Sequence, residues 1–492
     1  MKRSKKYKIL FAAAEVTPFA KTGGLADVAG SLPKYISALG HDVRIIMPRY
    51  KMIDNEMKSI ADFPIKMGES DRTCIIKELQ LKLDLESDST FSQNIPVYFA
   101  ENYYYFGHQG IYGHSNDDER FAFFCKAILE MLPKINFQPD IIHLNDWHTG
   151  PVCMLLKERY VSDSFYSNIG TVFTVHNLEY QGNFPSSALK HFDMPDTVFT
   201  PEKVEFYGSF SFMKAGLCYA DIINTVSMVY AEEVKTPQCG AGLEGLLTKR
   251  SDDLYGITNG IDYGVFNPYT DPNIYYKYTA SDRSGKKLNK SCLQKEMGLP
   301  ELDVPIIGLI SRLAGQKGLD LVLEAFNQLI SNEIQFILLG TGDRYYENAF
   351  KTLKKKYPDK LGLHIGFNSA LAPKIYAGSD LFLMPSHFEP CGLGQLISLR
   401  YGTIPIVRAT GGLEETVIDI DSYPDSGNGF SFKEFTSEAM MNAVTRSLKL
   451  YNDSPAIWDD LVGRAMNQDN SWNRSAERYV ELYDKVHKRY KS

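Results

Sequence analysis

Short apolar runs alternate with amphipathic stretches through the first half of the chain. The runs predict buried strands at residues 8–14, 42–47, 139–145, 169–177 and 221–227. A period near 3.6 predicts helices between them, at residues 25–39, 119–132 and 150–159. Because strands that alternate with helices form parallel β-α-β units, this half predicts a doubly wound α/β domain with helices on both faces of its sheet.

The pattern restarts in the second half. Further apolar runs predict strands at residues 305–311, 334–340, 361–367, 380–386 and 403–409, with a helix at 318–330. Residues 268–300 lack strand signals, which puts a domain boundary near residues 254–260. We therefore predict two Rossmann-like domains, 1–256 and 257–471, and a C-terminal helix, 472–492, that crosses back to the first domain. Such sheets bind ligands at the carboxyl ends of their strands, so we expect the two domains to face a deep cleft.

Composition narrows the class of protein. The 492 residues are 44% hydrophobic and 23% charged, as in ordinary globular proteins, and the net charge of −7 disfavours nonspecific binding to nucleic acid or to an anionic membrane. The chain has no run of about 18 apolar residues, so no transmembrane helix is predicted. The basic N-terminus precedes an apolar run that Glu15 and Pro18 interrupt, so we interpret the run as a strand and not as a signal peptide. Seven scattered cysteines without a C-x-x-C pair favour a reducing cytoplasm.

The segment "KTGGLAD" stands just before a predicted helix. Gly23 and Gly24 allow the backbone to approach an anion closely, and the helix N-terminus offers N–H groups and a positive dipole end. Lys21 adds a point charge that can reach a phosphate. A solvated lysine in a tight turn explains the same pattern equally well.

The segment "SRLAGQKGLD" follows the first strand of the second domain. Arg312 and Lys317 lie in a predicted loop that ends at Gly318 and opens a helix, which suits a diphosphate. The alternative is a basic loop on an acidic surface, but a ligand is expected at this strand end.

The segment "PSHFEPCGLGQ" follows a later strand of the same domain, and Pro390, Cys391 and Gly392 are predicted to open a helix. Glu389 can accept hydrogen bonds from sugar hydroxyls, and the amides of Cys391, Gly392 and Leu393 can donate to a phosphate or a sugar. No neighbouring base activates Cys391 as a nucleophile, and a helix cap with a buried thiol is the structural alternative.

Histidines follow two strands of the first domain, in "HLNDWHTG" and "TVHNLEYQGNF". The spacing of His143, His148 and His176 matches no zinc pattern, and a lone histidine is more often a hydrogen-bonded structural residue. Asp146, His148 and His176 nevertheless lie at strand ends, where contact with substrate is expected.

Three further segments carry turn or ligand signals. Asn259 and Gly260 form a turn near the boundary between the domains. Thr410 and Gly411 begin a second Gly-Gly helix start that can face a phosphate or a sugar. The D-x-D sequence at residues 419–421 is outside any Gly-rich loop, and we interpret it as solvated.

Taken together, these motifs resemble those of the bacterial glycogen synthase and plant starch synthase family. They occur in the family's order over nearly the whole chain, as KILFAAAEVTPFAKTGGLADV, DWHTG, TVHNLEYQG, NGIDY, SRLAGQKG, HFEPCGLGQL and RATGGLEETV. The resemblance implies a GT-B fold and transfer of glucose from ADP-glucose to the non-reducing 4-OH of an α-1,4-glucan, with retention of configuration. It implies no cofactor and no metal, and no nucleic-acid or membrane partner; it leaves the oligomeric state open.

The resemblance also implies roles for individual residues. The residues matched to the reacting sugar and the departing ADP are Glu389, Arg312, Lys317 and His176. Those matched to ADP-glucose binding are Lys21, Gly23, Gly24, Phe367, Cys391, Gly392, Leu393, Thr410 and Gly411. Those matched to the acceptor side are Glu15, Asp27, Asp146, His148 and Asn259. Phe367 falls where the family places an aromatic ring against adenine.

Two positions depart from related patterns. Ile397 stands where wider GT-B families carry a second glutamate, which favours the starch and glycogen synthase branch, and Asn145 stands where many members have histidine. Another GT-B enzyme that uses UDP-glucose or a different acceptor remains an alternative. A silent glucan-binding homologue is disfavoured because Lys21, Arg312, Lys317 and Glu389 are all present. A dehydrogenase is disfavoured because no G-x-G-x-x-G follows the first strand.

Overall fold

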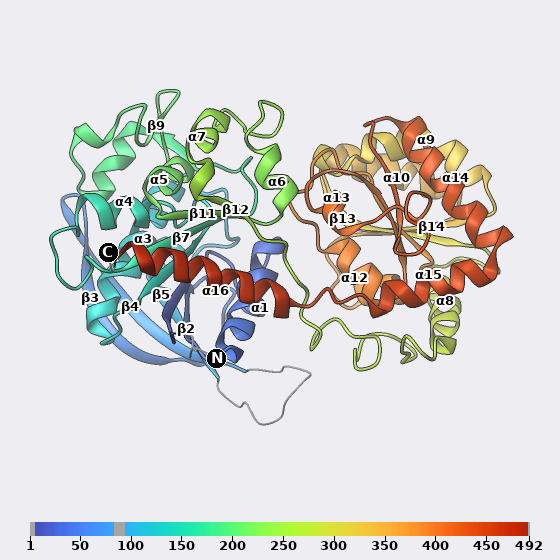
Figure 1. The fold of residues 1–492 in the computed structure, drawn as a ribbon, viewed down its shortest axis with the longest axis horizontal. Helices are drawn as coiled ribbons and strands as arrows, with labels where there is room; N and C mark the ends of the chain where they lie inside the picture. Colours follow the sequence, from blue (N-terminus) through green and yellow to red (C-terminus); the bar gives the residue numbers. More distant parts are fainter. Residues whose placement is uncertain (1–4, 83–93, 491–492) are drawn as a thin grey trace. The chain divides into compact units, whose positions relative to one another are not determined.

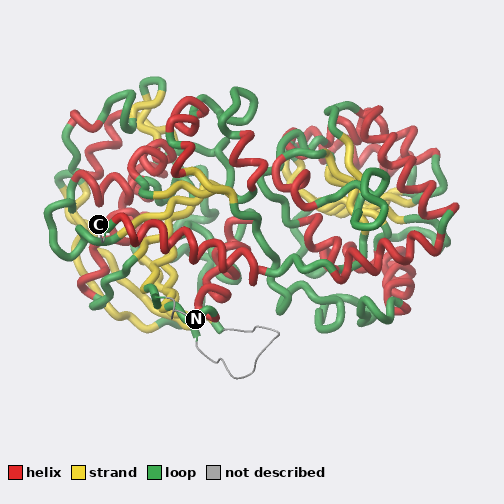
Figure 2. Tube along the Cα trace, viewed as in Figure 1, coloured by secondary structure: helices red, strands yellow, loops and turns green. Residues whose placement is uncertain are grey.

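The computed structural model describes residues 5–82 and 94–490. Its internal contacts divide the chain into two compact units. Unit 1 comprises the described residues of Met1–Asn259 and Trp472–Ser492, and unit 2 comprises Gly260–Ser471. In each unit a central sheet carries helices on both faces (Figures 1 and 2).

Seven parallel strands form the main part of the unit 1 sheet, in the order β12-β11-β7-β6-β1-β2-β5 among the described residues. Their bounds are β1 Lys8–Ala12, β2 Asp42–Pro48, β5 Ile95–Glu101, β6 Ile141–Asn145, β7 Gly170–Val175, β11 Ile222–Thr225 and β12 Leu254–Gly256. Strands β6 and β7 are buried along their whole length, as parallel strands covered on both faces must be. The strand order reverses between β1 and β6, and loops leaving such a switch point diverge and leave room for a ligand.

Two antiparallel strands extend this sheet beyond β5. They are β3 (Lys58–Met67) and β4 (Ser70–Leu81), which pair with each other and, through β4, with β5. The prediction of a purely parallel sheet is therefore wrong at this edge. These long strands alternate buried and exposed residues, with charged residues outward, so they lack the continuous apolar run that revealed the inner strands. A small separate sheet, also unforeseen, joins β8 (Asn183–Pro185), β10 (Ser209–Ser211) and β9 (Glu205–Phe206).

Helices cover both faces of the unit 1 sheet. Their bounds are α1 Gly24–Ala38, α2 Tyr103–Phe106, α3 Asp117–Lys134, α4 Pro151–Glu158, α5 Phe212–Tyr219, α6 Met228–Glu233, α7 Glu244–Lys249 and α16 Trp472–Arg489, with 3-10 turns at Ser186–Phe192, Asp196–Val198 and Ser251–Asp253.

The C-terminal helix α16 belongs to unit 1, although the whole of unit 2 precedes it in the sequence. It packs on α1 and on strands β6 and β7. Its apolar face is buried, and the hydroxyl of Tyr483 lies 2.7 Å from Nδ1 of the buried His143, whose Nε2 lies 2.8 Å from the Thr174 hydroxyl. His143 thus has a structural place beneath α16.

Unit 2 contains a parallel sheet in the order β15-β14-β13-β16-β17-β18. Numbered along the unit, this order is 3-2-1-4-5-6, the Rossmann order, and the reversal lies between β13 and β16. The strands are β13 Ile306–Leu313, β14 Gln335–Gly342, β15 Leu361–Ile365, β16 Leu381–Met384, β17 Ile404–Arg408 and β18 Phe430–Phe432. The predicted doubly wound class is confirmed here without an antiparallel extension.

The unit 2 helices connect these strands. They are α8 Ser284–Glu296, α9 Leu319–Ser331, α10 Arg344–Lys356, α11 Leu371–Gly378, α12 Gly394–Arg400, α13 Gly411–Thr416, α14 Ser437–Asp453 and α15 Pro455–Asn467, with a 3-10 turn at Gly315–Lys317. Helix α8 lies within residues 268–300, the region predicted to lack strands, and none of these residues, all of which the structure describes, forms a strand.

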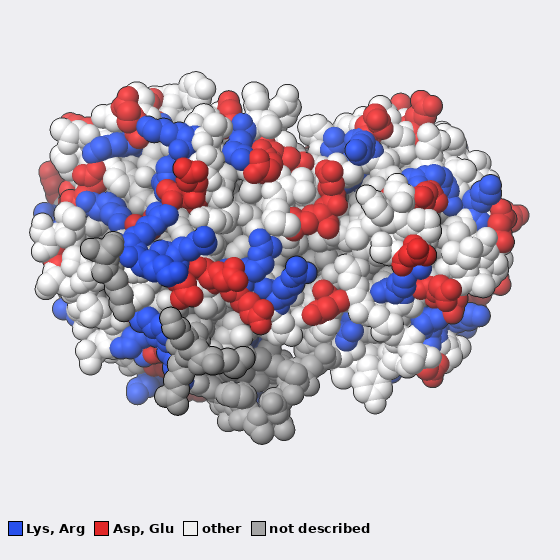
Figure 3. Space-filling model, viewed as in Figure 1, with Lys and Arg blue, Asp and Glu red and all other residues white. Residues whose placement is uncertain are grey.

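Acidic and basic side chains are interspersed on the face of the molecule shown in Figure 3. Across the described residues, no helix combines the length and the apolar character needed to span a membrane.

Candidate functional site

In unit 1, the loop after β1 is held together by Glu15. This carboxylate is buried and accepts hydrogen bonds from the Thr22 hydroxyl (2.7 Å), the Gly23 amide (3.3 Å) and the Tyr112 hydroxyl (2.5 Å). It also accepts from the Thr22 amide. Glu15 therefore shapes the "KTGG" loop at the β1 side of the switch point.

Lys21 projects from this loop and is half-exposed. Its ammonium group lies 2.6 Å from the Asp27 carboxylate in the first turn of α1. Gly23 precedes α1 in an extended conformation, and a Cβ added to it meets no atom within 4 Å. Neither packing nor backbone strain explains the glycine there, so the open space above Gly23 is available to a ligand.

At the ends of β6 and β7, Asp146 and His176 are joined. The Asp146 carboxylate accepts the His176 backbone N–H at 2.7 Å, and Asp146 itself adopts a positive φ of 57°. Burial raises the pKa of Asp146 to about 7, although the amides of His176 and Asn177 oppose this shift. Burial lowers the pKa of His176 to about 3, so its imidazole is neutral at physiological pH.

His148 is buried in an aromatic cluster. Its ring packs on Trp147 (centroids 3.9 Å apart), on Tyr112 (4.8 Å) and on Phe121 (4.8 Å), and burial holds its pKa well below the ordinary value. Within the described residues its Nδ1 has no hydrogen-bond partner. Tyr112 also donates a hydrogen bond to Glu15. The packing of His148 on Tyr112 therefore helps to hold the loop after β1 in place.

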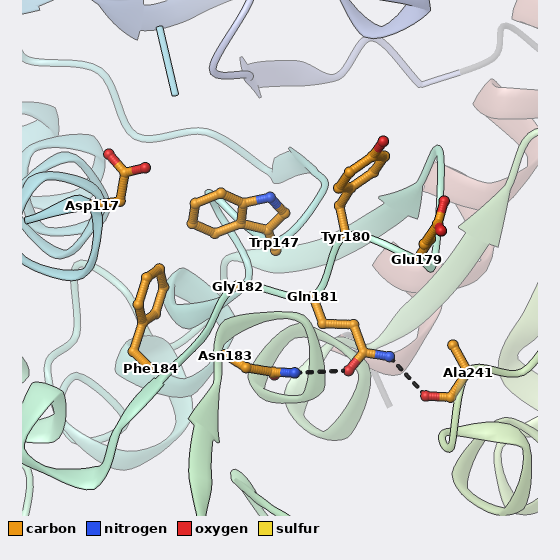
Figure 4. Close-up of a pocket in the computed structure, with 9 residues that line it drawn as sticks. All are labelled: Asp117, Trp147, Glu179, Tyr180, Gln181, Gly182, Asn183, Phe184 and Ala241. Atoms are coloured by element: carbon orange, nitrogen blue, oxygen red, sulfur yellow. Dashed lines mark hydrogen bonds between the residues drawn. The ribbon is translucent and has the colours of Figure 1, made fainter. Parts of the chain in front are cut away.

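A pocket of about 500 Å³ opens beside this cluster (Figure 4). The residues that line it are Asp117, Trp147, Glu179, Tyr180, Gln181, Gly182, Asn183, Phe184 and Ala241. Gln181 is fixed by two hydrogen bonds, from Asn183 (3.2 Å) and to the Ala241 carbonyl (2.9 Å). A Cβ at Gly182, whose φ is 59°, meets the Trp147 ring at 2.3 Å, so only glycine fits beneath the indole.

Sequence reasoning named the segments around Trp147 and Tyr180 but assigned no role to the lining residues. The aromatic and amide side chains after β7 were a usable signal. The sequence gives no signal that Ala241 lines the pocket, because only the tertiary fold brings it to Gln181.

In unit 2, Lys317 and Glu389 form an ion pair at the switch point. Lys317 Nζ lies 2.7 Å from Glu389 Oε2, which also accepts from the Ser386 hydroxyl at 2.9 Å. The Glu389 side chain is only 9% exposed, and these two contacts replace part of the water that it loses on burial. Arg312 is exposed and donates to Gln316 at 3.2 Å.

The prediction that Arg312 lies in a loop is wrong. Arg312 is within β13 and is paired in register with Thr341 on β14. The strand continues past the apolar run because its last residues still pair with β14, although their side chains are polar. Only Lys317 lies in the turn that follows.

Two glycines bring the loops of this edge together. Gly318 has a φ of 66°, and a Cβ there lies 1.9 Å from the Pro385 carbonyl; Gly411 has a φ of 49°, and a Cβ there lies 2.1 Å from the Glu389 carbonyl. The Gly412 amide also donates to that carbonyl at 3.1 Å. Backbone contact this close holds the loop that carries Glu389 against the turn that carries Lys317.

The remaining predicted residues of unit 2 lie around these loops. Helix α12 begins at Gly394, so the prediction that Cys391 and Gly392 open it is wrong; both lie in the preceding turn, where Gly392 has a φ of 74°. Leu393 is the N-cap of α12, and Thr410 is the N-cap of α13. Phe367 follows β15 and is 77% exposed, open to a stacking partner.

Two further predictions concern Asn259 and the D-x-D sequence at residues 419–421. Asn259, the last residue of unit 1 before Gly260, is buried, and its Oδ1 has no partner within the described residues. The interpretation of residues 419–421 as solvated is wrong for Asp419. Its carboxylate is 10% exposed, pairs with Arg446 at 3.2 Å and accepts the Ser431 amide at 2.7 Å.

A Rossmann-like sheet in each unit, with polar loops gathered at both switch points, defines a glycosyltransferase of the GT-B class. The starch synthase catalytic domain family matches residues 8–249, and the glycosyl transferases group 1 family matches residues 294–459. The chain belongs to the glycogen synthase and starch synthase family of glycosyltransferases.

Individual relatives are similar over almost their full length. The chain is 51% identical to a glycogen synthase of Desulforudis audaxviator, over 97% of this chain and 96% of that protein. It is 47% identical to the glycogen synthase of Geobacillus stearothermophilus, over 98% of each.

Solved structures agree with the fold. The catalytic domain of starch synthase IV from Arabidopsis thaliana, bound to ADP and acarbose, superposes with a TM-score of 0.92 at 33% identity, over 98% of this chain and 100% of that chain. Sucrose-phosphate synthase from Thermosynechococcus elongatus shares the fold, with a TM-score of 0.61 at 18% identity, over 98% and 99% of the two chains.

Proposed function

We propose that this enzyme transfers glucose from ADP-glucose to the non-reducing 4-OH of an α-1,4-glucan, with retention of configuration and release of ADP. The observation that carries the proposal is the Lys317–Glu389 pair, next to Arg312, at the switch point of the unit 2 sheet. Cations suit a departing diphosphate, and a buried carboxylate suits sugar hydroxyls, so the two demands of the reaction are met within one set of loops.

The proposed step breaks the bond between C1 of glucose and the diphosphate oxygen and forms a bond between C1 and the acceptor oxygen. The acceptor proton passes to the departing diphosphate on the same face of the sugar, which preserves configuration. Arg312 and Lys317 stabilise the developing negative charge, and each well-placed group contributes about 3–4 kcal/mol. Glu389 orients the sugar and forms no covalent intermediate.

The other nucleotide-sugar contacts are proposed from the family likeness. Phe367 stacks on adenine, and its exposure supports this assignment. Lys21 contributes to the diphosphate, with backbone of the Gly23–Gly24 turn beside it; the space above Gly23 supports this role. Further backbone groups bind the sugar and the phosphates or allow the chain to approach them closely. They belong to Cys391, Gly392, Leu393, Thr410 and Gly411.

Unit 1 is proposed to bind the sugars. His176, with Asp146 beneath it, contacts the transferred glucose. The pocket lined by Trp147 and Tyr180 supports binding of the glucan, because aromatic rings and amide groups suit the apolar faces and hydroxyls of sugars. Glu15 and His148 shape this region from within, while Asp27 and Asn259 complete the acceptor side.

Donor competition tests the proposal. Labelled ADP-glucose and UDP-glucose are offered separately with glycogen, and incorporated label is measured with and without a chelator. We expect incorporation from ADP-glucose that is insensitive to the chelator and falls about 10²–10³-fold in Lys317→Ala. Lys295→Ala, which removes a 64% exposed lysine of α8, is the matched control and retains activity. A preference for UDP-glucose contradicts the donor assignment, and loss of activity with the chelator contradicts the metal-free scheme.

We further propose that the enzyme works in the cytoplasm without a cofactor. The seven cysteines are all free thiols, which supports a reducing compartment.

A further inference from the structure

Asn145, the last residue of β6, has an amide whose orientation is determined by its two partners. Its Nδ2 donates to the Ala12 carbonyl at 3.0 Å, and its Oδ1 lies 2.9 Å from Nε2 of His176. A carbonyl can only accept, so the NH₂ group must face Ala12 and the amide oxygen must face the imidazole. Asn145 is fully buried, so no solvent competes for either bond.

This orientation determines the tautomer of His176. A hydrogen bond to the amide oxygen requires a proton on Nε2. The ring carries one proton only, because burial keeps it neutral. Nδ1 is therefore an unprotonated acceptor, and within the described residues no protein group hydrogen-bonds it.

The backbone of His176 is held as well. Its N–H donates to Asp146 at 2.7 Å and its ring is held through Nε2, while the residue is partly exposed and its Nδ1 is not fully buried, so the Nδ1 edge is open. A neutral acceptor at that edge attracts a hydroxyl, which donates, and repels a phosphate oxygen, which cannot.

We propose that Asn145 is a positioning residue that holds the proton of His176 on Nε2, so that Nδ1 accepts a hydrogen bond from a hydroxyl of the bound sugar. The proposal concerns a residue that does not touch the sugar itself. Its second half rests on the proposed function, whereas its first half, the tautomer, does not.

The tautomer is tested first, on the wild-type protein without substrate. The ten histidines are labelled with ¹⁵N, long-range ¹H–¹⁵N spectra are recorded, and the resonances of His176 are assigned by their loss in His176→Gln. We expect a protonated Nε2 and an unprotonated Nδ1 that do not change through neutral pH. A proton on Nδ1, or an imidazolium, overturns the proposal even if the enzyme transfers glucose as proposed.

Transfer kinetics then test Asn145. Asn145→Leu removes the amide at similar volume, and we expect kcat/KM for glucosyl transfer to fall about tenfold, the value of one good hydrogen bond. The same substitution in a His176→Ala background is expected to cause little further loss, because Asn145 acts through His176. In the spectra of Asn145→Leu, the Nδ1–H tautomer should become detectable.

Thr149→Val is the matched control. Thr149 is buried, and its hydroxyl donates to the backbone carbonyls of Asn145 (3.0 Å) and Asp146 (3.2 Å) instead of to the ring of His176. We expect it to retain the wild-type tautomer and to add independently to His176→Ala. Equal losses from Asn145→Leu in both backgrounds would assign Asn145 a purely structural role and overturn the proposal. If wild type does not use ADP-glucose at all, the proposed function fails while the spectra still decide the tautomer.

Discussion

In both units, loops at the carboxyl ends of the parallel strands gather at a switch point, but the charges of the groups on these loops differ. In unit 2 the edge carries Arg312 and the Lys317–Glu389 ion pair. In unit 1 burial favours the neutral forms of the groups at the edge: it lowers the pKa of His176 to about 3 and raises the pKa of Asp146 to about 7. A shared fold thus supports two chemistries, charge stabilisation in one unit and neutral hydrogen bonding in the other, because the loops and not the sheet set the local environment.

The glycines differ in the same way. Gly318 and Gly411 of unit 2 combine a positive φ with backbone contacts that exclude a Cβ, whereas Gly23 of unit 1 has neither constraint. The unit 2 edge is therefore held together by packing within the protein, and the unit 1 loop retains space for something outside it.

Removing the cations of unit 2 should have the largest effect. For Arg312→Ala and for Lys317→Ala we expect turnover to fall about 10²–10³-fold, because each removes a charge that stabilises the leaving diphosphate. Thermal unfolding should change little for Arg312→Ala, since that side chain is exposed. Initial rates with ADP-glucose and glycogen, with Lys295→Ala as control, measure this; a fully active, folded Lys317→Ala protein contradicts the assignment.

Replacing one glycine in each unit by alanine tests whether the two loops differ in packing. Gly318→Ala should destabilise unit 2 by about 1–3 kcal/mol and displace Lys317, because its φ and its contact with Pro385 both exclude a side chain. Gly23→Ala should leave stability within about 0.5 kcal/mol of wild type but raise the KM for ADP-glucose. Denaturant unfolding and donor kinetics separate the two. An unchanged KM in Gly23→Ala shows that no ligand uses that space.

The pH dependence of stability probes the neutral edge of unit 1. The pKa of Asp146 is raised on folding from an ordinary value near 4 to about 7, so between these values the folded state binds the extra proton. Stability therefore falls as pH rises from about 4 to about 7, by at most about 4 kcal/mol from this group, at about 1.4 kcal/mol per pKa unit. Asp146→Asn keeps the acceptor for the His176 amide and tolerates the positive φ, so its stability should fall less over that range. Identical urea midpoints against pH for both proteins would place Asp146 in a charged state throughout.

Lys21→Ala should give the smallest effect. Lys21 is half-exposed and already paired with Asp27, so its loss should raise the KM for ADP-glucose only about three- to tenfold and leave kcat nearly unchanged. Lys51→Ala, at an exposed position after β2, is the control. Wild-type kinetics for Lys21→Ala remove Lys21 from the diphosphate site, and a large loss of kcat would make the two edges more alike than we propose.

Much of the fold could be predicted from local pattern. Continuous apolar runs in the sequence predicted ten strands, and each lies within a few residues of its predicted position: β1, β2, β6, β7, β11, β13, β14, β15, β16 and β17. Strands β5, β12 and β18 were not predicted. Strands β3 and β4 were missed because one face of each is solvated, which breaks the run. Arg312 was assigned to a loop because pairing with β14, not side-chain polarity, extends the strand.

For the candidate site, sequence motifs located the residues but not their partners. Lys317 and Glu389 are 72 residues apart, and they are brought together by the pairing of β13 with β16 and by the contacts of Gly318 and Gly411 with the neighbouring loop. The neutral state of His176 and the raised pKa of Asp146 depend on burial, which is a property of the packed unit. The sequence by itself determined the two doubly wound units and the chemical types at each strand end, because these follow from local periodicity and residue identity. Tertiary structure alone decided which charges pair, which groups are neutral and which nitrogen of His176 carries its proton, because desolvation and hydrogen-bond geometry arise only when distant segments meet.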